Sequence, residues 1–85
     1  MEHFEYLWVL AENKLKDETE ASTIEQICKE MSVKLALYGS LTNYTEDISF
    51  AKNRLLGDIV LLLTQITMKD NVDIYAVLQE ALKKH

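Results

Sequence analysis

The chain has 85 residues, of which 48% are apolar and 27% charged, and it contains two glycines and no proline. This length accommodates one domain, and the scarcity of turn-forming residues favours helices and argues against a β-rich fold. The formal net charge is −5, with 14 acidic residues against 9 basic ones. Without a cluster of lysine and arginine, this charge argues against a nucleic-acid partner.

The apolar content is high for such a short chain. A domain of this length buries only about 60–65% of the surface that its unfolded chain exposes, so its core is thin. Small domains commonly add stability by oligomerising, which buries apolar side chains between subunits. We therefore expect a homo-oligomer, either a dimer or a larger assembly.

Cellular location is inferred from three features of the sequence. Cys28 is the only cysteine, so no disulfide can form within the chain, as is usual in a reducing compartment. The first five residues lack the positive charge and apolar run of a signal peptide. No uninterrupted apolar run, residues 59–63 included, approaches the length of a membrane span. We expect a cytoplasmic protein without a membrane partner.

The first predicted helix covers about residues 2–16. Its apolar residues recur at three- and four-residue spacing, which is typical of one buried helix face: Phe4, Leu7, Trp8, Ala11 and Leu15. The acid-rich stretch 17–21 is expected to end the helix. Trp8 fits either the core or a surface that anchors a partner.

The second predicted helix covers about residues 23–39. Ser22 followed three residues later by Glu25 has the spacing of a capping box, so the helix is expected to begin at Ser22 or Thr23. Gly39 is a favourable residue at which to end it. One apolar stripe runs along the helix: Ile24, Ile27, Cys28, Met31, Leu35 and Tyr38.

The third predicted helix, about residues 46–68, is the most apolar part of the chain. Thr45 is a candidate for its N-terminal cap. Apolar residues cover most of its circumference, which predicts that it is buried on most sides and is central to the fold. We expect Leu55 and Leu62 of this helix, together with Trp8, to contribute to a subunit interface.

A turn at residues 69–71 leads to the last predicted helix, about residues 72–84. Lys83 and Lys84 at its end suit the negative end of the helix dipole. Four helices joined by short connections predict an all-α protein, an antiparallel four-helix bundle in a single domain over residues 1–85.

Asp58 is an acid among leucines. Because burying an unpaired carboxylate in a core costs several kcal/mol, the Asp58 side chain is expected to be exposed, paired with a base or bound to a cation. One interpretation is an ion pair with Arg54, one turn earlier. Glu30 of the second helix likewise has Lys34 one turn later as a potential ion-pair partner. If Glu30 and Asp58 face each other, however, two carboxylates converge, and such oxygen ligands suit Mg²⁺ together with the phosphates of a nucleotide.

At these residues the sequence resembles the MazG-like nucleotide pyrophosphohydrolases. The resemblance covers about residues 23–84, and its strongest part is the run 55–63 (LLGDIVLLL), followed by 72–74 (VDI) and 81–84 (ALKK). Residues 29–36 (KEMSVKLA) are similar to the family's first acidic motif. The resemblance implies an oligomeric all-α enzyme in which four carboxylates hold Mg²⁺ and water attacks a nucleoside triphosphate between its α and β phosphates.

Two of the family's four acidic positions carry acids in this chain. The resemblance implies Glu30 and Asp58 as metal ligands, while Val33 and Leu55 stand where the other two acids are expected. Lys83 and Lys84 are the residues that it suggests for phosphate contacts.

Two hypotheses about function follow. The first is a MazG-like protein with a nucleotide-related role, in which Mg²⁺-dependent pyrophosphohydrolysis depends on a reduced set of ligands. The second is a non-catalytic helical dimerisation or interaction module, such as a small regulatory or phage-type protein. The second is favoured by the missing acids, by the many apolar residues, and by the absence of a Ser–His or Cys–His arrangement in the sequence.

Overall fold

The computed structural model describes residues 2–44 and 47–85. These residues form four α-helices, α1 (Glu2–Ala21), α2 (Ile24–Ser40), α3 (Ser49–Lys69) and α4 (Ile74–Lys83), and one short 3₁₀-helix, η1 (Leu41–Asn43). The prediction of an all-α protein is confirmed for this part of the chain. None of the helices in the described ranges combines the length and apolar character that crossing a membrane would require.

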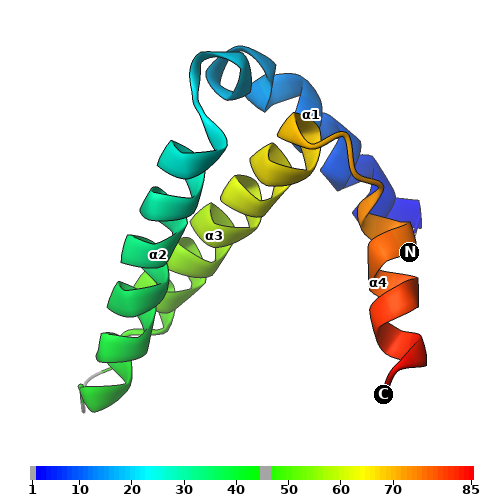
Figure 1. The fold of residues 1–85 in the computed structure, drawn as a ribbon. Coiled ribbons are helices and arrows are strands. Elements are labelled where there is room, and N and C mark those ends of the chain that lie inside the picture. Colours follow the sequence, from blue (N-terminus) through cyan, green and yellow to red (C-terminus); the bar gives the residue numbers. More distant parts are fainter. Residues whose placement is uncertain (1, 45–46) are drawn as a thin grey trace.

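The helices form an open arch rather than a closed bundle (Figure 1). α2 and α3 lie antiparallel, side by side, and form one leg; α1 crosses the C-terminal part of α3 at the apex, and α4 descends on the opposite side. Over the described residues, extensive packing between α-helices is confined to α2 against α3 and α1 against α3. The radius of gyration is 14.5 Å, against about 12 Å expected for a compact chain of this length. The predicted antiparallel packing of all four helices is therefore not completed within one chain.

α1 is longer than predicted, because the acid-rich stretch 17–21 continues the helix. Thr19 is buried, with 4% of its surface exposed, and its hydroxyl donates a hydrogen bond to the Leu15 carbonyl at 2.7 Å. Because its hydroxyl is hydrogen-bonded within the helix, Thr19 can extend the buried face of α1, although threonine does not count as apolar in the sequence pattern. The prediction that the helix ends at residue 16 is wrong for this reason.

The capping box of α2 lies one residue later than predicted. Thr23 is the N-cap and accepts a hydrogen bond from the Gln26 amide, while the Gln26 side chain accepts one from the Thr23 amide. The pairs Ser22–Glu25 and Thr23–Gln26 both have the spacing that a capping box requires. Only the path of the chain between α1 and α2 decides between them.

α3 begins at Ser49, three residues later than predicted. The proposed cap Thr45 and the predicted first residue Glu46 lie outside the described residues. Asp47 accepts hydrogen bonds from the Ser49 amide and hydroxyl, and these bonds lower the pKa of the Asp47 carboxyl.

The turn between α3 and α4 is a Schellman motif. Asn71 adopts a left-handed conformation with φ of 54°, and the Val72 amide donates to the Thr67 carbonyl at 2.9 Å. Asp73 then caps α4 by accepting hydrogen bonds from the amides of Tyr75 and Ala76. The helix consequently begins at Ile74, two residues later than predicted, and its direction is set by this short turn.

We predict that Asn71→Ala lowers the free energy of unfolding by about 1 kcal/mol, because a left-handed conformation is costly for most residues with a Cβ atom. Asn71→Gly is the matched control and should retain or increase stability, since glycine adopts this conformation freely. Urea unfolding at one fixed protein concentration would measure both variants. Equal losses in the two variants would contradict the conformational explanation.

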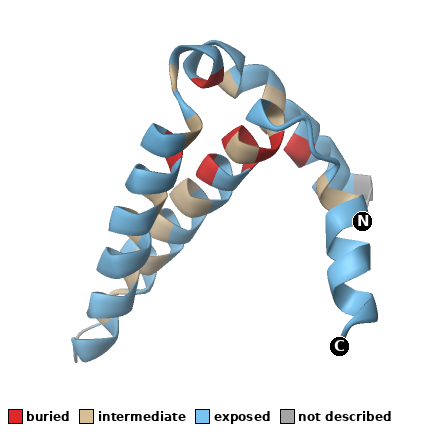
Figure 2. Cartoon of the chain, viewed as in Figure 1, coloured by how far each residue is buried: buried red, intermediate tan, exposed pale blue. Residues whose placement is uncertain are grey.

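The small core lies around the apex of the arch (Figure 2). Three large apolar residues are buried in the described part of the chain: Trp8, Ile27 and Leu62. Three threonines are buried as well, and each donates its hydroxyl to a carbonyl three or four residues earlier in its own helix: Thr19, Thr64 and Thr67. Trp8 and Leu62, which the sequence suggested for a subunit interface, thus belong to the core of the single chain, while Leu55 is half-buried.

Candidate functional site

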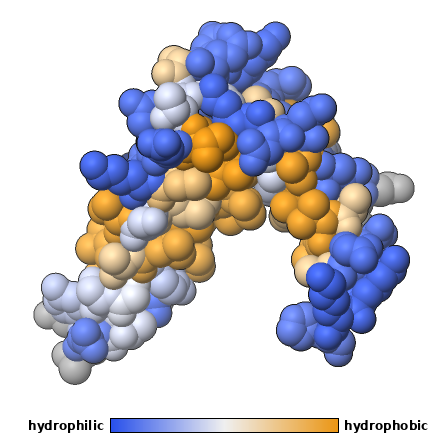
Figure 3. Space-filling view, viewed as in Figure 1, coloured by the Kyte–Doolittle hydropathy of each residue, from blue (hydrophilic) through white to orange (hydrophobic). Residues whose placement is uncertain are grey.

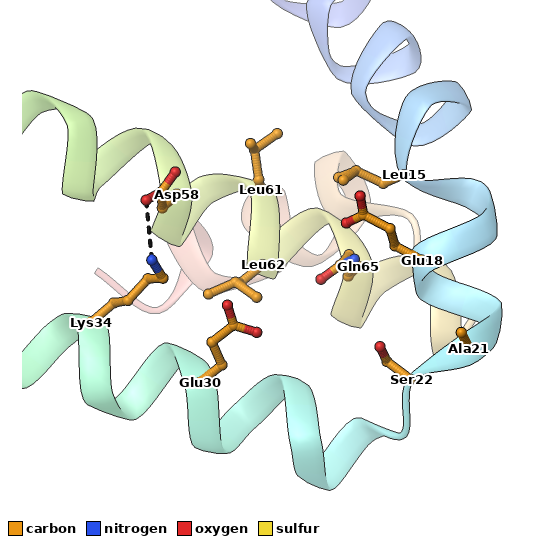
Figure 4. A pocket seen from close by; sticks show the side chains of 10 residues that line it. All are labelled: Leu15, Glu18, Ala21, Ser22, Glu30, Lys34, Asp58, Leu61, Leu62 and Gln65. Carbon is orange, nitrogen blue, oxygen red and sulfur yellow. Dashed lines mark hydrogen bonds and ion pairs between the residues drawn. The ribbon is translucent and has the colours of Figure 1, made fainter.

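An open pocket of about 440 Å³ lies where α1, α2 and α3 meet. Figure 4 shows α2 contributing Glu30 and Lys34, α3 contributing Asp58 and Gln65, and the C-terminal part of α1 contributing Glu18. The remaining lining residues are mainly apolar: Leu15, Ala21, Ser22, Leu61 and Leu62. The predicted pair Glu30 and Asp58 is therefore brought to one pocket.

Asp58 is paired with Lys34 of the neighbouring helix. The Lys34 Nζ lies 3.1 Å from the Asp58 Oδ2, and the two side chains are 28% and 41% exposed. The ion pairs suggested within single helices, Asp58 with Arg54 and Glu30 with Lys34, are replaced by this contact between α2 and α3. Arg54 is the basic residue nearest to Asp58 in the sequence, whereas the packing of α2 against α3 brings Lys34 to Asp58 in space.

The charges of the pocket do not cancel. Glu18, Glu30 and Asp58 contribute three carboxylates, against the single ammonium of Lys34. Within the described ranges, no three histidine, cysteine, aspartate or glutamate side chains are grouped so that they could hold a metal ion. Mg²⁺ is commonly bound by one or two carboxylates plus substrate phosphates. Glu30 and Asp58 fit that arrangement only if the Lys34 ammonium moves away from Asp58.

Lys83 and Lys84, suggested for phosphate contacts, lie at the free end of α4 and do not line this pocket. Lys83 approaches Glu80 of its own helix at 3.6 Å, and both side chains are largely exposed, so this contact adds little stability. The structure therefore separates the suggested phosphate-binding lysines from the suggested metal ligands within one chain.

Sequence reasoning missed the contribution of α1 to the pocket. Glu18 and Leu15 line it because the helix continues past residue 16 and crosses α3. The signal for this continuation in the sequence is the high helix propensity of Glu18, Glu20 and Ala21, which is independent of the apolar pattern.

A second feature is the apolar surface left uncovered on the arch (Figure 3). On α3, Leu56, Val60 and Leu63 are 42%, 43% and 38% exposed. On α4, Val77, Leu78 and Leu82 are 52%, 54% and 64% exposed. α1 adds further exposed apolar side chains: Phe4, Tyr6, Leu7, Val9 and Leu10. These exposed faces are too extensive to be the scattered apolar residues of an ordinary surface.

Comparison of the chain with protein-family models, with curated proteins and with solved structures gives no match.

Proposed function

We propose that the protein is a non-catalytic homodimerisation module, in which a second copy covers the apolar faces of the arch. The observation that carries this proposal is the size of the exposed surface. The accessible area is 6791 Å², whereas a folded monomer of 9.8 kDa exposes about 5,200 Å². The excess of about 1,600 Å² is within the share that one subunit contributes to an obligate dimer interface.

The Lys34–Asp58 ion pair also supports a non-catalytic role. An ammonium 3.1 Å from Asp58 occupies the carboxylate that a catalytic cation would need. Pairing accounts for the charge on an otherwise apolar helix without any ligand. The chain would then be a small regulatory or phage-type protein that joins two copies of itself and keeps the polar outer faces of its helices exposed to solvent.

Light scattering coupled to size-exclusion chromatography tests the proposal. The expected mass at micromolar concentration is twice the 9.8 kDa of the chain. A mass of 9.8 kDa at all concentrations up to the highest soluble one would refute it.

A nucleotide-related role is the second candidate. It is supported by the position of Glu30 and Asp58 on one pocket and by the resemblance of residues 23–84 to the MazG-like family. In this case Mg²⁺ would enter with the triphosphate, whose oxygens would complete its coordination, and Lys34 would turn from Asp58 toward a phosphate. Glu30 and Asp58 would hold the cation, while Lys83 and Lys84 would need to come from a second subunit.

Incubation with deoxynucleoside triphosphates and Mg²⁺, followed by measurement of pyrophosphate release, tests this second candidate. Release should require Mg²⁺ and should be lost in Asp58→Ala, while Gln79→Glu, which lies outside the pocket, should retain it. No release from the unmodified protein with any of the four common nucleotides would remove the candidate.

A further inference from the structure

Building on the proposed dimer, we infer that α4 of one copy packs along the apolar stripe of α3 in the second copy, and the reverse. The α3 stripe consists of Leu56, Val60 and Leu63, and the α4 stripe of Val77, Leu78 and Leu82. Two arches would then interlock about a twofold axis, each inserting its α4 into the open side of the other.

The α3 stripe continues a face that is already buried at the apex. Residues 56, 60, 63 and 67 succeed one another at intervals of four, three and four, so they lie on one side of the helix. Thr67 at the C-terminal end is 5% exposed, where α1 crosses α3. Toward the N-terminus of α3, none of the helices that the structure describes covers this face, and Leu56, Val60 and Leu63 remain 38–43% exposed. The stripe is a helix-packing face that lacks its helix.

α4 is a helix that lacks a packing surface. Its apolar residues follow the spacing of a single buried face: Ile74, Val77, Leu78, Ala81 and Leu82. In its own chain it is held near its first turn, where the Tyr75 ring meets the Phe4 ring of α1 edge-on at 6.5 Å. Beyond that contact, Leu78 and Leu82 are more than half exposed.

The turn between the two helices keeps the stripes of one chain apart. The Val72 amide is bonded to Thr67, and Asp73 caps α4 immediately afterwards, so no flexible linker is present. Folding α4 back onto its own α3 would break the hydrogen bonds of the Schellman motif and of the cap. In Figure 1, α4 correspondingly descends on the far side of the opening from α3. A second copy can bring an α4 to α3 without disturbing this turn.

The length and the charge of α4 both agree with its placement on the α3 stripe of a second copy. Along the helix axis, the α3 stripe (56–63) spans about 10.5 Å, and the apolar residues of α4 from 74 to 82 span about 12 Å, so α4 is long enough to cover the α3 stripe. In two interlocked arches, α4 of one copy points toward the apex of the other. Its basic end, Lys83 and Lys84, would approach the acidic end of α1 there: Asp17, Glu18 and Glu20. Opposite charges at the rim of an interface orient the partners.

Photo-crosslinking in isotopically mixed dimers tests this placement. p-Benzoylphenylalanine is introduced at Leu82, on the apolar stripe, or at Glu80, on the opposite side of α4, as the matched control. Chains labelled with ¹⁴N and ¹⁵N are mixed, irradiated and digested. Crosslinks between chains are recognised because they join one light and one heavy peptide. The mass of the unirradiated protein is measured in parallel by light scattering.

The expected result is a dimer in which position 82 crosslinks between chains to peptides of α3, with at least tenfold less product from position 80. A dimer whose crosslinks from position 82 reach only its own chain, or reach another helix of the partner, would overturn the placement of α4 and leave the proposed dimer standing. A monomeric mass would overturn both.

Discussion

Val60→Glu should convert the dimer into a monomer, raising the dissociation constant on the order of 1,000-fold or more. Val60 is the middle residue of the α3 stripe and is 43% exposed in the single chain. Burying an unpaired carboxylate costs several kcal/mol, and a twofold interface incurs this cost at two equivalent positions. Each 1.4 kcal/mol corresponds to a tenfold change in affinity, so the combined effect reaches that range.

Gln79→Glu introduces the same charge on the polar face of α4 and should leave the dissociation constant within about twofold of the original, as is usual for a rim or surface site. Analytical ultracentrifugation would measure both variants, and circular dichroism would verify that each retains its helices. If the unmodified protein is a dimer and Val60→Glu leaves its dissociation constant unchanged, the α3 stripe is not part of the interface.

Ile27→Ala should lower the free energy of unfolding by about 2–4 kcal/mol, the range for removing a large aliphatic side chain from a core. Ile27 is 2% exposed, the lowest value among the large apolar side chains that the structure describes. A chain of this size has a total stability of only about 4–13 kcal/mol. With so few buried apolar residues near the apex, little rearrangement is available to fill the cavity.

Leu37→Ala is the matched control, since it shortens an aliphatic side chain of the same helix that is 49% exposed. It should cost less than about 1 kcal/mol. Urea unfolding is compared at one protein concentration, because the stability of a dimer depends on concentration. An equal decrease in the free energy of unfolding for the two variants would show that Ile27 is not at the centre of the core. The packing of α2 on α3 would then differ from that described above.

The Lys34–Asp58 pair links the two candidate functions, because the same carboxylate can satisfy either an ammonium or a cation. In the arch the ammonium is in place, and Glu30, one helical turn from Lys34, lines the same pocket. Any nucleotide chemistry at this pocket therefore requires Lys34 to exchange its partner. In this respect the pocket differs from a site composed of carboxylates alone, where a cation could bind without displacing an ammonium.

The all-α class and the approximate extent of most helices follow from the amino-acid sequence alone. Periodicity, helix propensity and the scarcity of glycine and proline act over a few neighbouring residues, so they can be read without the fold. Local rules were weaker at the helix ends. At the start of α2, two overlapping residue pairs both have the spacing of a capping box. At the end of α1, Thr19 reads as polar in the sequence, yet it can be buried because its hydroxyl is hydrogen-bonded within its own helix.

The arrangement of the helices and the pairing of their charges depend instead on tertiary packing. The Lys34–Asp58 contact joins residues 24 positions apart, and it depends on the register of α2 against α3 rather than on spacing within either helix. The Schellman turn at Asn71 likewise directs α4 away from α3 and leaves the arch open. Burial is a property of the assembled surface, so a stripe of apolar residues indicates that a face will be covered but not which helix covers it, nor whether that helix belongs to the same chain.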